Sequence, residues 1–399
     1  MKRPPGIDSY VIAWRRHFHK NPELSFREFQ TSRAVAAELK KLGIMVRSRV
    51  GGTGVVGLLQ GGRKGRTVAL RADMDALPVD EDNRTSYASK NPGIMHACGH
   101  DGHMAMLLGA ARLLSRQRKD IAGQVKFLFQ PGEETPPGGA LGMIRDGALE
   151  APRVDAVFAF HLDSSLPTGQ AGLRKGPMMA ASDNFEITIA GKGGHAARPH
   201  DCLDPVTAAA QIITGLQTIV SRRVDPVWPA VVTVGQVQAG SKHNIIPQQA
   251  ILTGTARTID PHSAKMMPVW IGQMAEGIAR ANGLKASLSY ERGYPVLVND
   301  PGMIDLCEKV IISLCGKRAV VRISEPMMGG EDMAYFLQKA PGAFVRLGSR
   351  KDGATSYPWH HPKFAIDEKA LPLGAGILAE IALNYLSRQQ GAMNARQNP

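Results

Sequence analysis

Three short apolar runs, each followed at once by residues that can do chemistry, constrain this chain most. They cover residues 67–72, 125–130 and 156–161 and indicate buried β-strands. Segments with helical apolar spacing, at 26–43 and 101–118, lie among them. This alternation predicts an α/β domain. Because open α/β sheets bind ligands just beyond the carboxyl ends of their strands, the residues that follow these runs are the first candidates for a functional site.

A second block with a different pattern interrupts this domain. Its predicted elements are, in order, a strand at 184–190, a helix at 205–220, strands at 231–237 and 251–258, a helix at 263–281 and a strand at 286–290. The order βαββαβ is that of the ferredoxin-like split unit. Helix-rich α/β sequence resumes after Pro295. We therefore expect an α/β/α domain made of residues 1–182 and 296–399, with an inserted ferredoxin-like domain of residues 183–295.

Length, composition and charge argue against several classes of protein. With 399 residues, 43% of them hydrophobic and 21% charged, the chain has the balance of a globular protein of more than one domain. Neither a signal peptide nor a run of roughly 18 apolar residues is evident, so we expect a soluble protein without a membrane partner. Four cysteines without CxxC spacing favour the reducing cytoplasm. The net charge of +13 comes from scattered basic residues without aromatic partners, so we expect no nucleic-acid partner.

The densest group of potential metal ligands is the string HACGHDGH at 96–103. Cys98 and His100 stand two apart on an expected extended turn, so a sulfur and an imidazole nitrogen can face one metal ion, with Asp101 or another carboxylate behind them. Gly99 permits the tight bend. Taken alone, the cysteine fits a small buried apolar residue better, and the outer histidines fit ordinary polar groups beside a helix. The cluster as a whole favours metal binding.

Two adjacent carboxylates, Glu133 and Glu134, follow the apolar strand at 125–130. Adjacent residues in such a loop usually point in opposite directions. One carboxylate can therefore bind metal while its neighbour accepts a proton from the attacking water. Alone, the pair fits a solvated acidic turn better, but in the company of Cys98 and His100 it favours a functional role.

Two further histidine positions complete the set of candidate ligands. His161 ends the strand at 156–161, where a neutral core imidazole is ordinarily the commoner explanation, but its place at a strand end favours a ligand. His360 and His361 lie in a loop rich in Tyr and Trp, and one of the two suffices. Cysteine, histidine and glutamate together match zinc, cobalt, nickel or manganese better than calcium or magnesium.

Several strings in the chain are jointly very specific. They are RADMDALP at 71–78, HACGHDGH at 96–103, FQPGEE at 129–134, GGH at 193–195, NIIP at 244–247 and GED at 330–332, together with His161 and His360. In these strings, which span nearly the whole chain in the family's order, the chain resembles the amidohydrolase branch of the aminoacylase/carboxypeptidase metallopeptidase family. That branch includes hippurate hydrolases and the plant hydrolases of auxin-amino-acid conjugates.

The resemblance implies a site with two divalent metal ions per subunit. Its implied ligands are Cys98, His100, Glu134, His161 and His360. The resemblance also makes Glu133 the catalytic base and brings His195 to the reacting carbonyl. Asn244 and Arg257 are candidates for holding the carboxylate of the substrate, a role that suits the forked guanidinium, although a surface salt bridge on a strand fits Arg257 about equally well. The inserted domain is then a lid that forms a homodimer.

The chain departs from the wider family at a few positions. Peptidase members have a metal-binding histidine two residues before the aspartate matched by Asp73, and here Arg71 takes that place. Cys98 supplies the missing ligand, as is usual in the amidohydrolase branch, and this leaves the identity of the metal and the occupancy of both metal positions open. Gly132 and Met104 replace the commoner alanine and threonine.

The sequence therefore predicts a metal-dependent amidohydrolase that cleaves the amide bond of N-acyl amino acids and releases a carboxylic acid and an amino acid. A metal-activated hydroxide attacks the acyl carbonyl, and Glu133 takes the proton of the water and passes it to the leaving amine. One alternative is an aminoacyl or dipeptide hydrolase on the same scaffold. Another is a non-catalytic metal-binding protein, against which the retention of Glu133 argues. The preferred acyl group and amino acid stay open.

Overall fold

The computed structural model describes residues 5–397 and divides the chain into two compact units. The first unit comprises Met1–Gly176, Val298–Ser324 and Tyr335–Pro399. The second comprises Pro177–Leu297 and the short segment Glu325–Ala334. The chain therefore leaves the first unit twice, once to build most of the second unit and once for its short segment, and returns each time.

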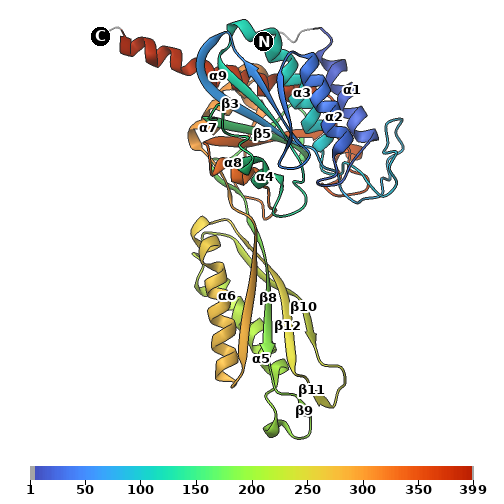
Figure 1. Ribbon diagram of the computed structural model, residues 1–399, viewed down its shortest axis with the longest axis vertical. Helices are drawn as coiled ribbons and strands as arrows, with labels where there is room; N and C mark the ends of the chain where they lie inside the picture. Colours follow the sequence, from blue (N-terminus) through green and yellow to red (C-terminus); the bar gives the residue numbers. More distant parts are fainter. Residues whose placement is uncertain (1–4, 398–399) are drawn as a thin grey trace. The chain divides into compact units, whose positions relative to one another are not determined.

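An eight-stranded sheet forms the centre of the first unit (Figure 1). In order across the sheet, the strands are β1 (Met45–Val50), β2 (Gly54–Gln60), β4 (Ala122–Gln130), β3 (Arg63–Asp73), β5 (Ala156–Pro167), β16 (Gly342–Arg350), β6 (Ala171–Leu173) and β15 (Val320–Arg322). Strands β4, β3, β5 and β16 pair in parallel. The three apolar runs of the sequence are the inner strands β3, β4 and β5, so their carboxyl ends share one edge of the sheet.

Helices of this part of the chain lie around the sheet, and most of them contact its strands directly. They are α1 (Ile7–Lys20), α2 (Phe29–Lys41), α3 (His100–Arg116), α4 (Gly139–Arg145), α7 (Pro301–Cys315), α8 (Met333–Leu337) and α9 (Ala370–Gln397). Helices α3 and α9 pack on each other and on β3. Strand β4 is buried along nearly its whole length, including Phe127 and Phe129, as expected for a parallel strand that is covered on both faces.

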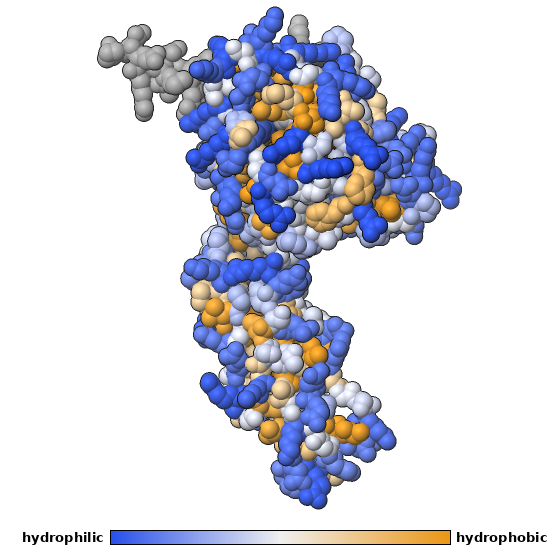
Figure 2. All heavy atoms as spheres, viewed as in Figure 1, coloured by the Kyte–Doolittle hydropathy of each residue, from blue (hydrophilic) through white to orange (hydrophobic). Residues whose placement is uncertain are grey.

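The stretch Ala370–Ser387 of α9 is the one helix, in the part of the chain that the structure describes, that is long and apolar enough to cross a membrane. However, 67% of this stretch is buried, and Leu371, Ile377 and Leu378 belong to the core of the first unit. The helix therefore packs as a core helix. On the face drawn in Figure 2, hydrophilic and hydrophobic residues are interspersed in both units.

The second unit has the predicted βαββαβ order. Its elements are β8 (Ala181–Ala190), α5 (Pro205–Arg222), β10 (Ala230–Ala239), β12 (Gln249–Thr258), α6 (Pro261–Ala281) and β13 (Lys285–Tyr294). The strands form an antiparallel sheet in the order β10-β12-β8-β13, and α5 and α6 pack together on one side of it (Figure 1). Residues Ile187 and Leu252 of the sheet meet Ile212 and Ile271 of the helices in this core.

Two pairs of very short strands complete the structure. Strand β9 (Gly194–His195) pairs with β11 (Ile245–Ile246), and both lie near one end of the four-stranded sheet (Figure 1). Strand β7 (Gly176–Met179) pairs with β14 (Leu297–Asn299), where the chain leaves and re-enters the first unit.

The predicted fold class is confirmed: an α/β unit with a large central sheet carries an inserted ferredoxin-like unit. Local differences have simple causes. The helix expected at 26–43 begins only at Phe29, because the side chains of Glu23 and Glu28 bond backbone amides around its start. Strand β1 was not predicted because its residues alternate poorly and are mostly exposed at the edge of the sheet.

Candidate metal centre

Side chains from four segments of the first unit meet beyond the carboxyl ends of the inner strands. Cys98 lies just before α3, and His100 is the first residue of that helix. Gly99 between them has a left-handed φ of 91°, which glycine adopts without strain. The Glu133 loop follows β4, and His161 lies on β5. His360 lies in the loop after β16, where its backbone N–H donates to Ala97 O at 2.8 Å and so fixes this loop beside the start of α3.

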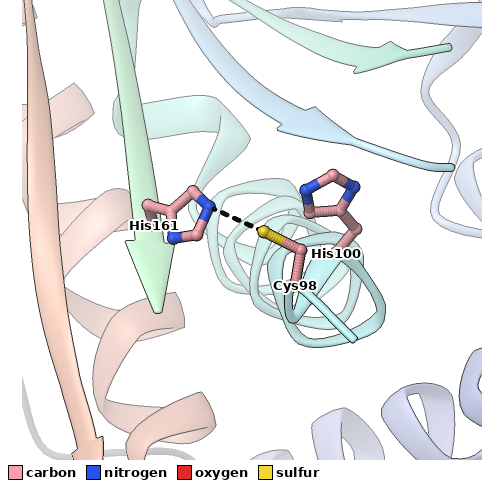
Figure 3. A group of neighbouring side chains, drawn as sticks. All are labelled: Cys98, His100 and His161. Carbon is pink, nitrogen blue, oxygen red and sulfur yellow. Dashed lines mark hydrogen bonds between the residues drawn. The ribbon is translucent and has the colours of Figure 1, made fainter. Parts of the chain in front are cut away.

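The potential ligand atoms lie close together. Cys98 Sγ is 3.5 Å from His161 Nε2, and His100 lies on the other side of the sulfur (Figure 3). His360 Nε2 is 3.3 Å from Glu134 Oε1, and His100 Nε2 is 3.8 Å from the same oxygen. Three overlapping groups, Cys98–His100–His161, Cys98–Glu134–His360 and His100–Glu133–Glu134, each have their ligand atoms within 4.8 Å of one another. All six side chains can therefore share one centre of two neighbouring ions.

Hydrogen bonds turn the imidazole rings toward this centre. His100 Nδ1 lies 2.9 Å from the carbonyl oxygen of Asp75 and donates to it, and His161 Nδ1 donates to Leu162 O at 2.9 Å. With Nδ1 engaged in each ring, Nε2 is the nitrogen left to face the cluster. His100 Nε2 is buried and has no hydrogen-bond partner. A buried nitrogen that lacks a donor and faces sulfur and carboxylate oxygens is what a metal ligand requires.

The electrostatics of this cluster of side chains also favour a bound cation. Burial, together with the carboxylates of Glu134 and Glu133, raises the pKa of the Cys98 thiol well above its ordinary value. Burial lowers the pKa of His100, but the carboxylates of Asp73, Asp75 and Glu134 outweigh it and raise this pKa to about 10. A buried pocket with this much negative charge is stabilised by a divalent ion, which also converts a coordinating thiol to its thiolate. The residues present therefore fit zinc, manganese or a related metal.

Asp73 and His103, to which the sequence assigned no role, hold β5 at Leu162, the residue after His161. His103 Nδ1 donates to Asp73 Oδ1 at 2.6 Å, and its Nε2 accepts from Leu162 N at 2.9 Å. Trp359 Nε1 donates to Leu162 O at 2.9 Å, and its ring lies 4.6 Å from the ring of His161. The bond of His103 to Leu162 and the packing of the Trp359 ring together fix the position of His161. Only the closeness of these residues to the ligand strings signalled them in the sequence.

A second group of three potential ligands, Asp73, His100 and His103, also lies within 4.8 Å. It is a poorer metal site, because Arg71 Nη1 forms an ion pair with Asp73 at 2.8 Å and both nitrogens of His103 are already bonded. Arg71 thus places a positive charge against Asp73, where a metal ion would otherwise have to bind.

Asp101 does not stand behind the candidate ligands, as the sequence had suggested as one choice. Its carboxylate accepts from Arg15 Nε at 2.8 Å, from the Nδ1 of His19 at 2.7 Å and from the amide of Gly102. The carboxylate beside the candidate ligand His100 is that of Asp75, whose Oδ1 is 3.3 Å from His100 Nδ1. Asp101 instead ties the first turn of α3 to α1.

The remaining candidates lie in the second unit, at opposite ends of its sheet. His195 pairs with Ile245, and the amide of Ala196 donates to Asn244 O at 3.1 Å, so His195 and Asn244 are neighbours. Arg257 lies near the far end of β12, where its Nη1 donates to backbone oxygens of Asp183 and Ala256. The structure therefore brings His195 and Asn244 together and separates both from Arg257.

These features place the chain among known enzymes. It belongs to the peptidase family M20/M25/M40, whose model matches residues 69–384. An N-acyl-L-amino acid amidohydrolase of Geobacillus stearothermophilus is 48% identical over 297 residues, which are 74% of this chain and 80% of the relative. Thermostable carboxypeptidase 2 of Saccharolobus solfataricus is 42% identical over 386 residues, 96% of this chain and 97% of the relative. The crystal structure of the YxeP protein of Bacillus subtilis, described as a dinuclear metal-binding peptidase of the M20 family, matches with a TM-score of 0.84 at 36% identity and covers 96% of this chain and 99% of that one.

Proposed function

We propose that this protein is a metal-dependent amidohydrolase that cleaves the amide bond of N-acyl amino acids. One observation carries the proposal: Glu133 and Glu134 lie side by side at a buried cluster of sulfur, imidazole and carboxylate donors. The family membership and the name of the 48% identical relative agree with it. The proposed ligands of two divalent ions are Cys98, His100, Glu134, His161 and His360.

The residues of the chain divide the chemistry between them. Cys98, His100, Glu134, His161 and His360 would hold the metal ions, which would supply an activated water and polarisation of the acyl carbonyl. Glu133 is buried, and its Oε2 lies 4.0 Å from His100 Nε2, so its carboxylate faces the same space as the ligands. It accepts the proton of the attacking water and then delivers it to the nitrogen of the leaving amino acid.

His195 is the proposed donor to the oxygen of the reacting carbonyl. Its Nδ1 accepts from the amide of Ala197 at 3.0 Å, so the proton of the neutral ring sits on Nε2. A histidine with this tautomer donates one hydrogen bond outward, which is what a developing oxyanion needs.

The placement of the substrate-binding candidates supports the proposal of a homodimer. The nine residues from Gln249 to Arg257 extend along β12 for roughly 26 Å. A single small substrate cannot reach both Asn244 and Arg257 of one unit. We therefore propose that Asn244 and Arg257 do not hold one substrate from the same chain, and that a homodimer brings His195 and Asn244 to the substrate of the partner subunit.

The finer assignments rest on chemistry. A hippurate-like substrate, with an aromatic acyl group on an amino acid, is the proposed class, and zinc and manganese are the first metals to test. All four cysteines of the chain are free thiols, which agrees with a reducing cytoplasm. The name of the 42% identical carboxypeptidase keeps peptide hydrolysis as the second candidate.

A substrate screen tests the proposal. The metal-free protein, reconstituted with Mn²⁺, Zn²⁺, Co²⁺ or Ni²⁺, is incubated with N-benzoyl and N-acetyl amino acids and with dipeptides, and release of the free amino acid is measured. We expect hydrolysis of N-acyl amino acids that is lost with a chelator and restored by metal. Faster cleavage of dipeptides would favour the second candidate, and no hydrolysis of any amide with any metal would contradict both.

A further inference from the structure

The loop that carries Glu133 is held by a carboxylate from a distant part of the first unit. Glu28 is fully buried just before α2. Its Oε1 accepts from the amide of Gly132 at 2.8 Å and from the amide of Phe26 at 2.9 Å. The hydroxyl of Thr53 donates to the other carboxylate oxygen. The side chain therefore joins three segments, and one of its bonds reaches the residue directly before the proposed base.

The residue on the other side of Glu133 is held in a similar way. The amide of Glu134 donates to Asp75 Oδ2 at 2.9 Å, and the hydroxyl of Ser25 donates to the same oxygen at 2.7 Å. Both peptide N–H groups that flank Glu133 are thus bonded to buried carboxylates. Both carboxylates also bond to the segment 25–28.

A close packing contact supports the same segment. Gly132 has a left-handed φ of 59°, and a Cβ added there would lie 2.5 to 2.7 Å from ring atoms of Phe26. The ring therefore lies where a side chain would otherwise stand. This contact explains why glycine occupies a position at which the resemblance leads one to expect alanine.

From these contacts we propose that Glu28 is a positioning residue for Glu133: by bonding the amide of Gly132, it fixes the loop so that the base faces the metal centre. The proposal rests on the proposed function of Glu133. The physical basis is the reach of the side chain. Glu28 can fix the loop only if its carboxylate oxygen lies within hydrogen-bond distance of the Gly132 amide. A loop displaced by about 1 Å can cost on the order of 10²-fold in rate.

The charge of Glu28 is secondary to this reach. Burial raises the pKa of Glu28 to about 7, and the hydrogen bond with Thr53 only partly offsets it. An uncharged oxygen at the same place can still accept from both amides. Glutamine preserves that oxygen and can donate to Thr53, whereas aspartate keeps the charge but is shorter by about 1.5 Å.

The test compares Glu28→Gln, Glu28→Asp and Glu28→Ala with Glu23→Ala in the metal-loaded enzyme. Glu23 is the matched control, because its carboxylate bonds the amides of Gln30 and Thr31 in the first turn of α2 at 2.9 Å each and so also stabilises the start of that helix. For each variant kcat, KM, bound metal and the hydrogen exchange of amides 132–135 are measured.

We expect Glu28→Ala to lose about 10- to 100-fold in kcat with KM within about threefold and metal content unchanged. Glu28→Gln should keep kcat within about threefold of the wild type. Glu28→Asp should have a lower kcat than Glu28→Gln and exchange amides 132–135 faster. Glu23→Ala should leave kcat within about twofold. If Glu28→Ala does not fold, the comparison of Gln with Asp decides the question.

Higher kcat for Glu28→Asp than for Glu28→Gln would overturn the proposal, since charge and not reach would then matter. Wild-type kcat for Glu28→Ala would overturn it as well. Glu133→Gln is assayed in parallel. Undiminished turnover in that variant refutes the proposed function, whereas an inactive Glu133→Gln beside fully active Glu28 variants refutes the positioning role alone.

Discussion

Replacing Arg15 with methionine should destabilise the first unit far more than the same change at its neighbour Arg16. Arg15 Nε donates to Asp101 Oδ2 at 2.8 Å, and only 3% and 1% of these side chains are exposed. The Nδ1 of His19 is 2.7 Å from the same oxygen. Arg15 and His19 outweigh the effect of burial and hold the pKa of Asp101 well below its usual range, so the carboxylate is charged in the folded protein.

The size of the effect follows from burial. Removing one partner of a buried ion pair costs about 3–5 kcal/mol, which corresponds to roughly 6–10 °C in melting temperature at about 2 °C per kcal/mol. Arg16 is a close match, because its Nη2 lies 2.6 Å from Glu368 Oε2 and its guanidinium, like that of Arg15, lies 4.8 Å from the ring of Tyr87. However, its side chain is 46% exposed. An exposed ion pair contributes about 0–1 kcal/mol, so Arg16→Met should lower the melting temperature by less than about 2 °C.

The loss of stability should also depend on pH. Burial and Arg15 lower the pKa of His19, but Asp101 and Glu81 outweigh them and raise it above its ordinary value. Protonation of His19 therefore stabilises the fold. This contribution is complete below the ordinary pKa of about 6.5 and is lost as the pH rises through the higher folded-state pKa. Without Arg15 the pKa of His19 rises further, so Arg15→Met should lose less stability at pH 6 than at pH 9.

Calorimetry of the metal-loaded wild type and both variants at pH 6 and pH 9 measures these effects. Similar melting temperatures for the two variants would refute the argument from burial. A larger deficit for Arg15→Met at pH 6 than at pH 9 would refute the role given to the protonation of His19.

Further predictions concern the metal centre. Glu133→Gln should lower kcat by about 10²- to 10⁴-fold with unchanged metal content, because it removes a base and no ligand. Glu134→Gln should instead lose metal affinity and recover activity partly at high metal concentration, and identical behaviour of the two variants would show that the division of roles is wrong. A thiol reagent should inactivate the metal-free enzyme faster than the metal-loaded one, since a ligating Cys98 thiolate is shielded, whereas equal rates would remove it from the ligand set. His195→Ala should bind metal normally and lose about 10²- to 10³-fold in kcat, and mixing it with Glu133→Gln should restore roughly a quarter of wild-type activity through mixed dimers. Mixed dimers without rescue would exclude a contribution across the interface.

Much of the fold was predictable because its signals are local. The apolar runs at 67–72, 125–130 and 156–161 are buried inner strands, and the alternation of the inserted block is that of a sheet covered on one face. In both cases burial imposes a period on neighbouring residues, so a short window of sequence carries the information. The edge strand β1 lacks such a period, because its side chains are mostly exposed.

The sequence by itself determined which residue types are available to a metal centre, since the cysteine, histidine and glutamate candidates stand in recognisable strings, and that Glu133 and Glu134 follow an apolar strand. The structure then placed His161 within β5 and Cys98 just before α3. Only the tertiary structure decided how these residues are oriented and supported. Asp75 rather than Asp101 lies beside His100, and Glu28 bonds an amide 104 residues away. Such contacts join segments that are distant in the chain, and their geometry depends on how whole strands and helices pack. No local pattern of apolar and polar residues encodes which buried carboxylate reaches which amide.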